Sequence, residues 1–466
     1  MKTIPSLLRN TGVIRRIRSY METEFDQVMH TTLNPEGPGA IRIHLIPPRE
    51  EEDILGPSVA IINGTDIIPV NFLWAIMLCE TIKEINVYDG RTVSEEEIRK
   101  IPPAVAEKIK KLVWFLNRKS IEEDIRSMFA TFRQIAAREP VTANIRHLNI
   151  GEYADLMRAP HRMDLMVSAM TREGRWNCNL KCVHCYAAGQ ACSDEKEIST
   201  DEWKKILDRL RKIGVPQVTF TGGEPTMRED LPVLIKYARW FISRLNTNGI
   251  RLTEEYCREL RKAELDSVQI TLYSADAAVH NILVGADGFE RTAAGIDNAL
   301  KAGLSLSINT PLCTLNKNYT DTLRWLHEKG VIYVTCSGLI TTGNAAGEAS
   351  EKLQLSQEEI TEVLREAAAC CAENGMELAF TSPGWIDEEV FAELGLASPA
   401  CGACLSNMAV TPSGNVVPCQ SWLSDEPLGS LLTDAWEDIW DGQTCMSCRN
   451  YAAEMTGKCP LRRYCR

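Results

Sequence analysis

The sequence predicts an α/β fold: a partial (β/α)6 barrel, parallel and not fully closed, between a small N-terminal α+β domain and a cysteine-rich C-terminal domain. Three observations predict it. Six strand-like segments alternate with amphipathic stretches in the middle of the chain. A β-hairpin signal followed by helical stretches precedes them. Ten of the 17 cysteines form two dense groups, one inside the alternating region and one at the C-terminus.

Composition narrows the class of protein. At 466 residues the chain is long enough for several domains. A net charge of −12 argues against non-specific nucleic-acid binding, which needs a basic surface. No apolar run reaches the roughly 18 residues of a membrane span, and the N-terminus lacks the apolar core of a secretory signal. We therefore expect a cytoplasmic protein whose cysteines ligate metal rather than form disulfides.

The N-terminal region predicts a small domain over residues 41–138, after an unassigned segment 1–40 and before a linker over 139–161. Residues 41–46 alternate like a strand, and residues 59–68 read as a hairpin that turns at Asn63-Gly64. Asn71 is expected to cap a helix. Two capping boxes predict the starts of further helices, Ser94 with Glu97 and Ser120 with Glu123.

The barrel is expected over residues 162–345, followed by a helical bridge over 346–398. Capping boxes at Ser199 with Glu202 and at Ser356 with Glu359 predict a helix in each. In parallel barrels the chemistry lies at the carboxyl ends of the strands. The six expected strands are residues 163–170, 217–221, 241–245, 268–272, 304–309 and 332–335.

A short loop after the first expected strand carries Cys178, Cys182 and Cys185, separated by three and then two residues. Three thiolates can hold three corners of an iron–sulfur cubane, whereas a closed cubane takes four. The fourth iron would then be free to bind a ligand. The alternative is that Cys192 supplies the fourth thiolate and closes the cluster.

A glycine-rich turn, Gly222-Gly223-Glu224-Pro225, follows the second expected strand. The two glycines allow a ligand to approach the backbone, and the glutamate can accept hydrogen bonds from an ammonium group. Taken alone, such a segment is usually an ordinary turn. Its position one strand after the cysteine loop makes a ligand site the better interpretation.

The loop and the turn together resemble the radical S-adenosylmethionine (SAM) enzymes. The resemblance implies that the open iron of a [4Fe-4S] cluster chelates SAM, and that the reduced cluster cleaves SAM to a 5′-deoxyadenosyl radical that abstracts a hydrogen atom. His184 occupies the position where the family carries an aromatic residue against adenine. The implied SAM contacts are Gly222, Gly223, Glu224, Asn246, Asn248, Thr271, Ser274 and His184. No catalytic acid or base beyond the cluster is predicted.

Seven cysteines lie within residues 399–466: Cys401, Cys404, Cys419, Cys445, Cys448, Cys459 and Cys465. Two Cys-x-x-Cys pairs can make a tetrahedral zinc site, but seven cysteines exceed one such site. The segment resembles the SPASM domain, which carries one or two auxiliary [4Fe-4S] clusters. The resemblance implies one cluster on Cys401, Cys404, Cys419 and Cys465, and a second on the remaining three. The family's usual eighth cysteine is absent.

Residues 41–138 resemble the winged-helix-like recognition element of enzymes that modify ribosomally synthesised peptides (RiPPs). Such a module binds the leader of a precursor peptide as an added strand; the alternative is a structural domain. We therefore expect a peptide-modifying radical SAM enzyme that takes electrons from a flavodoxin or ferredoxin. The alternatives are a sulfatase-activating type of maturase, an enzyme of tetrapyrrole or cofactor synthesis, and a non-catalytic iron–sulfur or zinc protein.

Overall fold

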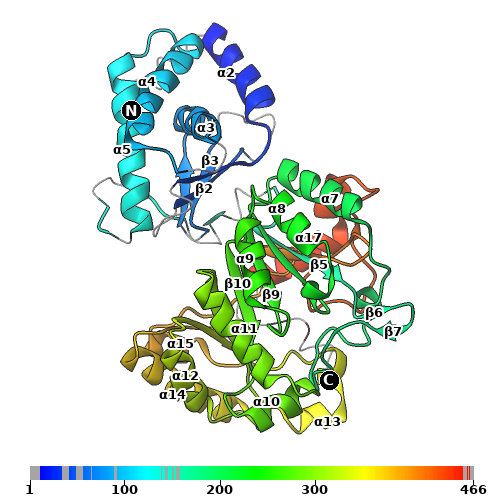
Figure 1. The fold of residues 1–466 in the computed structure, drawn as a ribbon. Coiled ribbons are helices and arrows are strands. Elements are labelled where there is room, and N and C mark those ends of the chain that lie inside the picture. The colour runs from blue at the N-terminus through cyan, green and yellow to red at the C-terminus, as the bar shows by residue number, and fades with distance from the viewer. Residues whose placement is uncertain are drawn as a thin grey trace. The chain divides into compact units, whose positions relative to one another are not determined.

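The computed structural model describes residues 11–33, 41–48, 56–64, 66–88, 92–137, 139–141, 145–148, 152–153, 158–454, 459 and 461 (Figure 1). The chain divides into two compact units. Unit 1 comprises Met1–Ala159 with the short segments Asp208–Pro216 and Trp240–Ile242, and unit 2 comprises the remainder.

Among its described residues, unit 1 contains a four-stranded antiparallel sheet in the order β1-β2-β3-β4 and the helices α2 to α5. The hairpin prediction is confirmed: Asn63 (φ 50°) and Gly64 (φ 78°) supply the two positive φ angles of the turn between β3 and β4. Part of segment 1–40, which had no sequence assignment, also belongs here. The elements are α2 (Thr11–Glu24), β1 (Met29–Leu33), β2 (Ile41–Ile46), β3 (Ser58–Ile62), β4 (Asp66–Val70), α3 (Phe72–Asn86), α4 (Glu95–Leu112) and α5 (Arg118–Ala136).

Two of the three predicted helix caps in unit 1 are confirmed. Asn71 accepts hydrogen bonds from the first turn of α3, and Ser94 forms a reciprocal capping box at α4. The capping box predicted at Ser120 is wrong. Asn117 caps α5 through the backbone N–H of Lys119, so the helix begins earlier and Ser120 lies within its first turn. Asparagine caps at least as well as serine, and the earlier cap gains additional helical hydrogen bonds.

Unit 2 is built on a ten-stranded sheet in the order β13-β12-β11-β10-β9-β8-β5-β14-β15-β16. All six expected barrel strands are present within it, and helices connect them as predicted (Figure 1). The strands are β5 (Arg162–Ser168), β8 (Gln217–Gly222), β9 (Ile242–Thr247), β10 (Ser267–Thr271), β11 (Ser305–Pro311) and β12 (Tyr333–Ser337). The helices are α7 (Thr200–Ile213), α8 (Leu231–Tyr237), α9 (Glu254–Lys262), α10 (Ala277–Val284), α11 (Phe289–Lys301) and α12 (Tyr319–Glu328).

Both edges of the barrel sheet are extended by later parts of the chain. The expected helical bridge contains α14 (Gln357–Glu373), opened by the predicted Ser356 capping box, but also β13 (Glu377–Phe380), which pairs in parallel with β12. On the opposite edge, β14 (Asn407–Val410) pairs in parallel with β5. The cysteine-rich segment is thus continuous with the barrel sheet, since an open barrel leaves edges that favour pairing. The remaining elements include α15 (Glu388–Leu394), β15 (Asn415–Val417), β16 (Gly429–Ser430), α16 (Trp436–Trp440) and α17 (Gln443–Glu454).

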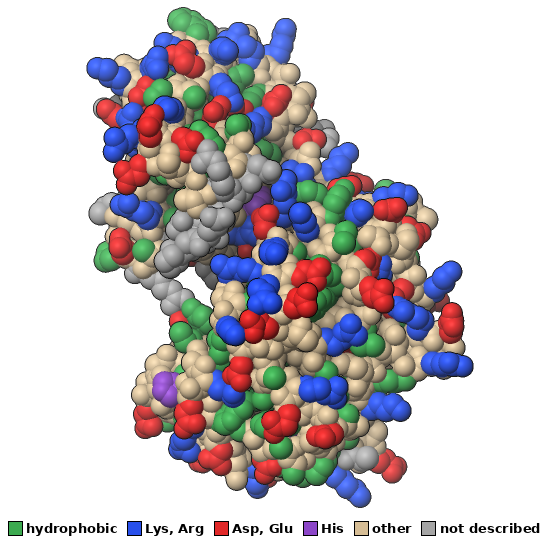
Figure 2. All heavy atoms as spheres, viewed as in Figure 1, with side chains coloured by type: hydrophobic (Ala, Val, Ile, Leu, Met, Phe, Trp, Pro, Cys, Tyr) green, Lys and Arg blue, Asp and Glu red, His purple; other side chains and the backbone are tan. Residues whose placement is uncertain are grey.

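On the surface visible in Figure 2, acidic and basic side chains are interspersed. Among the helices that the structure describes, none combines the length and the apolar character needed to cross a membrane.

Two buried imidazoles in unit 2 predict a loss of stability in mild acid. Burial lowers the pKa of His161 to about 4, helped by the nearby Arg162, and burial lowers the pKa of His280 to about 4. The unfolded chain binds these protons near pH 6.5, so stability is fully present above that pH and falls as the pH drops towards 4. We expect a loss on the order of 2–3 kcal/mol per histidine, measured by urea unfolding between pH 7 and pH 4.5.

The matched control for this prediction is His280→Asn. Its side-chain oxygen can replace Nδ1 as acceptor for the Tyr273 N–H but cannot take up the proton. The variant should lose stability less steeply in acid than the parent chain. Identical slopes would contradict the assignment to His280.

Candidate active site

The cysteine loop lies at the carboxyl end of the parallel strands and is held by its backbone. The N–H of Lys181 donates to Val284 O (3.0 Å), at the end of α10, and the N–H of Asn344 donates to Cys185 O (2.9 Å). Gly285 follows α10 with φ +65°, and a Cβ there would lie 2.4 Å from Lys181 O. The loop therefore packs against a helix end that only glycine allows to come so close.

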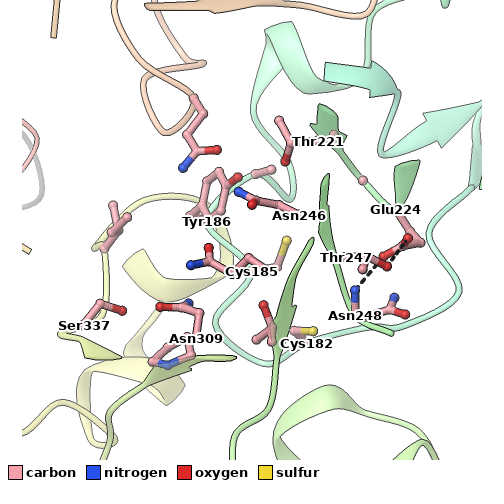
Figure 3. Close-up of a pocket in the computed structure, with 18 of the residues that line it drawn as sticks. Cys182, Cys185, Tyr186, Thr221, Glu224, Asn246, Thr247, Asn248, Asn309 and Ser337 are labelled. Atoms are coloured by element: carbon pink, nitrogen blue, oxygen red, sulfur yellow. Dashed lines mark hydrogen bonds between the residues drawn. The ribbon is translucent and has the colours of Figure 1, made fainter. Parts of the chain in front are cut away.

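The three cysteines of this loop line one cavity of about 410 Å³. Figure 3 shows two of them, Cys182 and Cys185. The walls of the cavity come from the inner faces of the barrel strands, where side chains alternate between the cavity and the surrounding helices. On β9, for example, Arg244 and Asn246 face the cavity, as does Asn248 just beyond the strand. Of the predicted site residues, the cavity is lined by Cys178, Cys182, Cys185, His184, Gly222, Gly223, Glu224, Asn246, Asn248 and Thr271.

The thiols suit a cationic cluster. Burial raises the pKa of Cys178 to about 12 and also raises the pKa of Cys182 and Cys185; the neighbouring thiols add to the effect at Cys178 and Cys182. Thiolates at this place therefore need positive charge, which bound iron supplies. Among the described residues, no three His, Cys, Asp or Glu side chains converge on the position of a single metal ion. A cubane places its thiolates on separate corners, and the three thiols of one short loop that line this cavity fit that arrangement.

Cys192 is placed elsewhere. Its Sγ donates to Asp425 O (3.5 Å), its backbone N–H donates to Leu423 O (3.0 Å), and its side chain does not line the cavity. The structure thus does not bring this candidate fourth ligand to the other three thiols.

Glu224 is the most firmly held polar group of the cavity, at 1% exposure. Its Oε1 accepts from the N–H and the hydroxyl of Thr226 (3.0 and 2.5 Å). Oε1 also accepts from Thr247 Oγ1 (2.7 Å), and Oε2 accepts from Asn248 N (2.9 Å) (Figure 3). Burial raises the pKa of Glu224, against the effect of these hydrogen bonds. Oε2 accepts one hydrogen bond among the described residues, fewer than Oε1, so it retains capacity for a ligand ammonium.

Of the other predicted SAM contacts, all line the cavity except Ser274. Asn248 donates from Nδ2 to Asn179 Oδ1 (2.7 Å), which links the end of β9 to the cysteine loop. His184 is 6% exposed, and neither ring nitrogen has a partner among the described residues. Thr271 lines the cavity, whereas Ser274 does not: its hydroxyl accepts from the N–H of Asp276 at the start of α10.

The sequence did not single out several other polar residues of the cavity. In the sequence, most of these residues show only as a polar side chain at every second position of a barrel strand. Which face of the strand points inward cannot be identified until the helices are placed. Tyr186 had a more direct signal, because it follows Cys185. The main examples are Tyr186, Thr221, Asn309 and Ser337 (Figure 3), together with Gln420.

Gly222 lies beneath this site. It has φ +137°, and a Cβ there would lie 2.2 Å from Ser168 O on the neighbouring strand β5. Gly222→Ala should therefore separate the strands that carry the cysteine loop and the glutamate turn. We expect a loss of about 3 kcal/mol or more in the free energy of unfolding, from a strained φ plus a backbone clash.

Gly330→Ala is the control for Gly222→Ala, because Gly330 also has positive φ (+87°) but nothing lies within 4 Å of its would-be Cβ. It should cost only the strain of the backbone, about 1–2 kcal/mol. Equal losses in chemical denaturation of the two variants would show that the approach of β5 to β8 is not the limiting feature.

The described C-terminal cysteines form two neighbouring groups. Cys401, Cys419 and Cys459 line a second cavity of about 160 Å³. The thiol of Cys404, a residue with φ 55°, instead contacts the thiols of Cys445 and Cys448. The resemblance placed Cys404 with Cys401 and Cys419, so the structure groups it differently. Cys465 lies outside the described residues.

Family models match both cysteine-bearing regions. Residues 177–326 match the radical SAM superfamily, and residues 401–466 match SPASM, an iron–sulfur cluster-binding domain. The chain is a radical SAM protein with a SPASM domain. Its cofactors are accordingly a [4Fe-4S] cluster, SAM and auxiliary iron–sulfur clusters. The cysteine loop and the C-terminal cysteines of this radical SAM protein are the groups that the structure offers for them.

Curated relatives differ in what they act on. The chain is 32% identical to an Fe-coproporphyrin III synthase of Methanosarcina barkeri over 39% of this chain and 47% of that protein. It is 28% identical to an AdoMet-dependent heme synthase of the same organism, over 62% and 86%. It is also 28% identical to a PqqA peptide cyclase of Streptomyces rochei, over 56% and 72%. The chain thus spans only about half the length of the Fe-coproporphyrin III synthase.

Solved structures share the fold. Streptococcus suis SuiB bound to the precursor peptide SuiA matches with a TM-score of 0.57 and 14% identity, over 91% of this chain and 89% of that chain. Native anSMEcpe with bound AdoMet matches with a TM-score of 0.51 and 16% identity, over 64% and 84%.

Proposed function

We propose that this radical SAM protein modifies a ribosomally made peptide, forming a thioether, a carbon–carbon crosslink or another oxidised linkage. The observation that carries the proposal is the extent of the fold likeness. Unit 2 holds roughly two thirds of the chain, so a match over 91% of it with a peptide-bound structure extends into unit 1. The 28% identical PqqA peptide cyclase supports the same substrate class.

The lining of the cavity supports a substrate with many hydrogen-bonding groups. Gln269 donates towards Ser307 Oγ and Thr335 Oγ1, and Thr335 donates to Asn309 Oδ1 (2.9 Å), so this layer of side chains inside the barrel is polar. Asn246 Oδ1 is buried without a partner among the described residues. A peptide N–H would satisfy it, and leaving it unpaired costs about 1–3 kcal/mol.

In this proposal each part of the site has a separate task. The bound cluster and SAM supply the radical that removes a hydrogen atom from the peptide. Glu224 Oε2 accepts from the ammonium of SAM, and Asn248 fixes the cysteine loop through Asn179. The half-enclosed cavity keeps water and competing hydrogen donors away. The C-terminal cysteines would hold the auxiliary clusters, which would supply an acceptor for the remaining electron or a contact for the peptide. A flavodoxin or ferredoxin would be the external electron donor in the cytoplasm.

Unit 1 would bind the leader of the peptide. Both edge strands of the described sheet accept a hydrogen bond from outside it: the carbonyl of His30 on β1 accepts from a side chain, Asn86 Nδ2 (2.8 Å), whereas the carbonyl of Ile67 on β4 accepts from a main-chain N–H, that of Leu148 (2.8 Å). A side chain can move away from the edge more easily than a segment of main chain can. An extended leader can add to a sheet edge through main-chain hydrogen bonds. The outer edge of β1 is therefore the proposed docking place.

The experiment combines product and binding readouts on the full chain. Anaerobic, reconstituted, reduced protein is incubated with SAM and short peptides encoded near its gene, and the peptide mass and 5′-deoxyadenosine are measured. A loss of two hydrogens in the peptide, matched by 5′-deoxyadenosine, supports the proposal. Hydrogen exchange with the same peptide should show new protection at Met29–Leu33. Modification without protection there would keep the activity but reject unit 1 as the leader site.

A tetrapyrrole enzyme is the second candidate, favoured by the 32% and 28% identical relatives from Methanosarcina barkeri. Decarboxylation of added Fe-coproporphyrin by the same preparation would favour it over the peptide proposal.

A further inference from the structure

Arg449 makes an unusual contact with the C-terminal thiols. It lies on α17, four residues after Cys445, so the two side chains share a face of the helix. Its Nη2 lies 3.4 Å from Cys445 Sγ and donates to Trp440 O (2.7 Å), while its Nε donates to Cys404 O (2.9 Å). One guanidinium thus contacts two of the cysteines that meet here.

The guanidinium is also fixed from one face. Its carbon lies 3.5 Å from the centroid of the Trp440 ring, and Trp436 stacks on Trp440 at 5.5 Å. A cation above an indole face is attracted by the ring quadrupole. Three hydrogen bonds and one stacking contact leave the Arg449 head little freedom to move away from the sulfur.

The sulfur that it contacts belongs to a group of three thiols, because Cys404 meets both Cys445 and Cys448. Three thiols suit a cluster, and this region matches an iron–sulfur cluster-binding domain. Hydrogen bonds to cluster sulfurs and nearby charge set the reduction potential. A fixed N–H donor and a positive charge stabilise the reduced cluster, which carries the additional electron.

We propose that Arg449 is a positioning residue which donates to the Cys445 thiolate and raises the reduction potential of the auxiliary cluster bound there. A purely structural Arg449, tying α17 to the carbonyls of Cys404 and Trp440, would leave that potential unchanged. The inference rests on the auxiliary-cluster part of the proposed function only. It needs no peptide, so it can fail while the peptide proposal stands, and the reverse also holds.

The test is a potentiometric titration followed by electron paramagnetic resonance. It uses the full chain with Cys178→Ala, Cys182→Ala and Cys185→Ala, so that only auxiliary clusters give a signal, and iron content is measured in each sample. In Arg449→Gln the ratio of reduced to oxidised auxiliary cluster at a given potential should fall about tenfold. This corresponds to a midpoint potential that is lower by about 59 mV for one electron. Arg449→Lys keeps the charge and should shift less.

Two controls make the result decisive. Arg365→Gln removes an exposed arginine that pairs with Glu393 on the surface and should leave the midpoint unchanged. Trp440→Leu retains Arg449 but removes its stacking partner, and should lower the midpoint by less than Arg449→Gln does. The proposal is overturned if Arg449→Gln keeps both its iron and the parental midpoint, if Arg365→Gln shifts as far, or if both Arg449 variants lose the iron.

Discussion

Replacing Cys182 by alanine is expected to abolish SAM cleavage. Cys182 is one of three thiols that face the same cavity, and two thiolates are too few to hold a cubane with one open iron. Formation of 5′-deoxyadenosine should fall to the level without enzyme, a loss of the full enzymatic acceleration of at least about 10⁶-fold. Iron content should fall by about four per chain, because the C-terminal clusters remain.

Cys192→Ala is the matched control for this prediction. Cys192 is buried, lies only seven residues after Cys185, and points to the carbonyl of Asp425 instead of the cavity. The variant should retain its iron and its rate of SAM cleavage. Loss of iron from Cys192→Ala would revive the closed four-thiolate cluster and would contradict the open-iron site.

Replacing Glu224 by alanine is expected to have the second largest effect, on stability and on SAM binding together. The carboxylate accepts from the backbone N–H groups of Thr226 and Asn248 and from the hydroxyl of Thr247. Removing it leaves buried donors without partners at a cost of about 1–3 kcal/mol each. We expect a loss of about 3–5 kcal/mol in unfolding free energy, measured by chemical denaturation without SAM.

Glu229→Ala is the control for Glu224→Ala, because this exposed glutamate lies five residues further along the same segment. It should change stability by less than about 0.5 kcal/mol. SAM affinity, measured by calorimetry on the anaerobic cluster-loaded protein, should fall at least about tenfold in Glu224→Ala. Unchanged SAM affinity in a folded Glu224→Ala variant would remove Glu224 from the ligand site and leave it a structural role.

Much of the site could be predicted from the spacing of residues along the chain. Three thiols on a short loop must lie near one another, and a turn at the end of the adjacent parallel strand must lie at the same edge. Cys178, Glu224 and Asn246 therefore line one cavity, as expected. Ser274 does not, because one step along a loop is enough to turn its hydroxyl to the helix start at Asp276.

Within unit 1, local sequence patterns predicted some elements correctly and failed for others. The Asn63-Gly64 turn was correct because positive φ is a property of two residues. The Ser120 cap was wrong because two good capping residues compete within one turn, and the earlier one, Asn117, gives a longer helix with more hydrogen bonds. Strand β1 had no recognisable pattern, and its pairing with β2 defines it.

The sequence by itself determined the cysteine loop, the glutamate turn and the six parallel strands, since each depends on spacing or periodicity over a few residues. Only the tertiary structure decided which edges β13 and β14 extend and where Cys192 points. It also decided how the C-terminal cysteines divide and that a guanidinium lies against one of them. These features depend on contacts between residues far apart in the chain, such as Cys192 with Asp425, which no local pattern encodes.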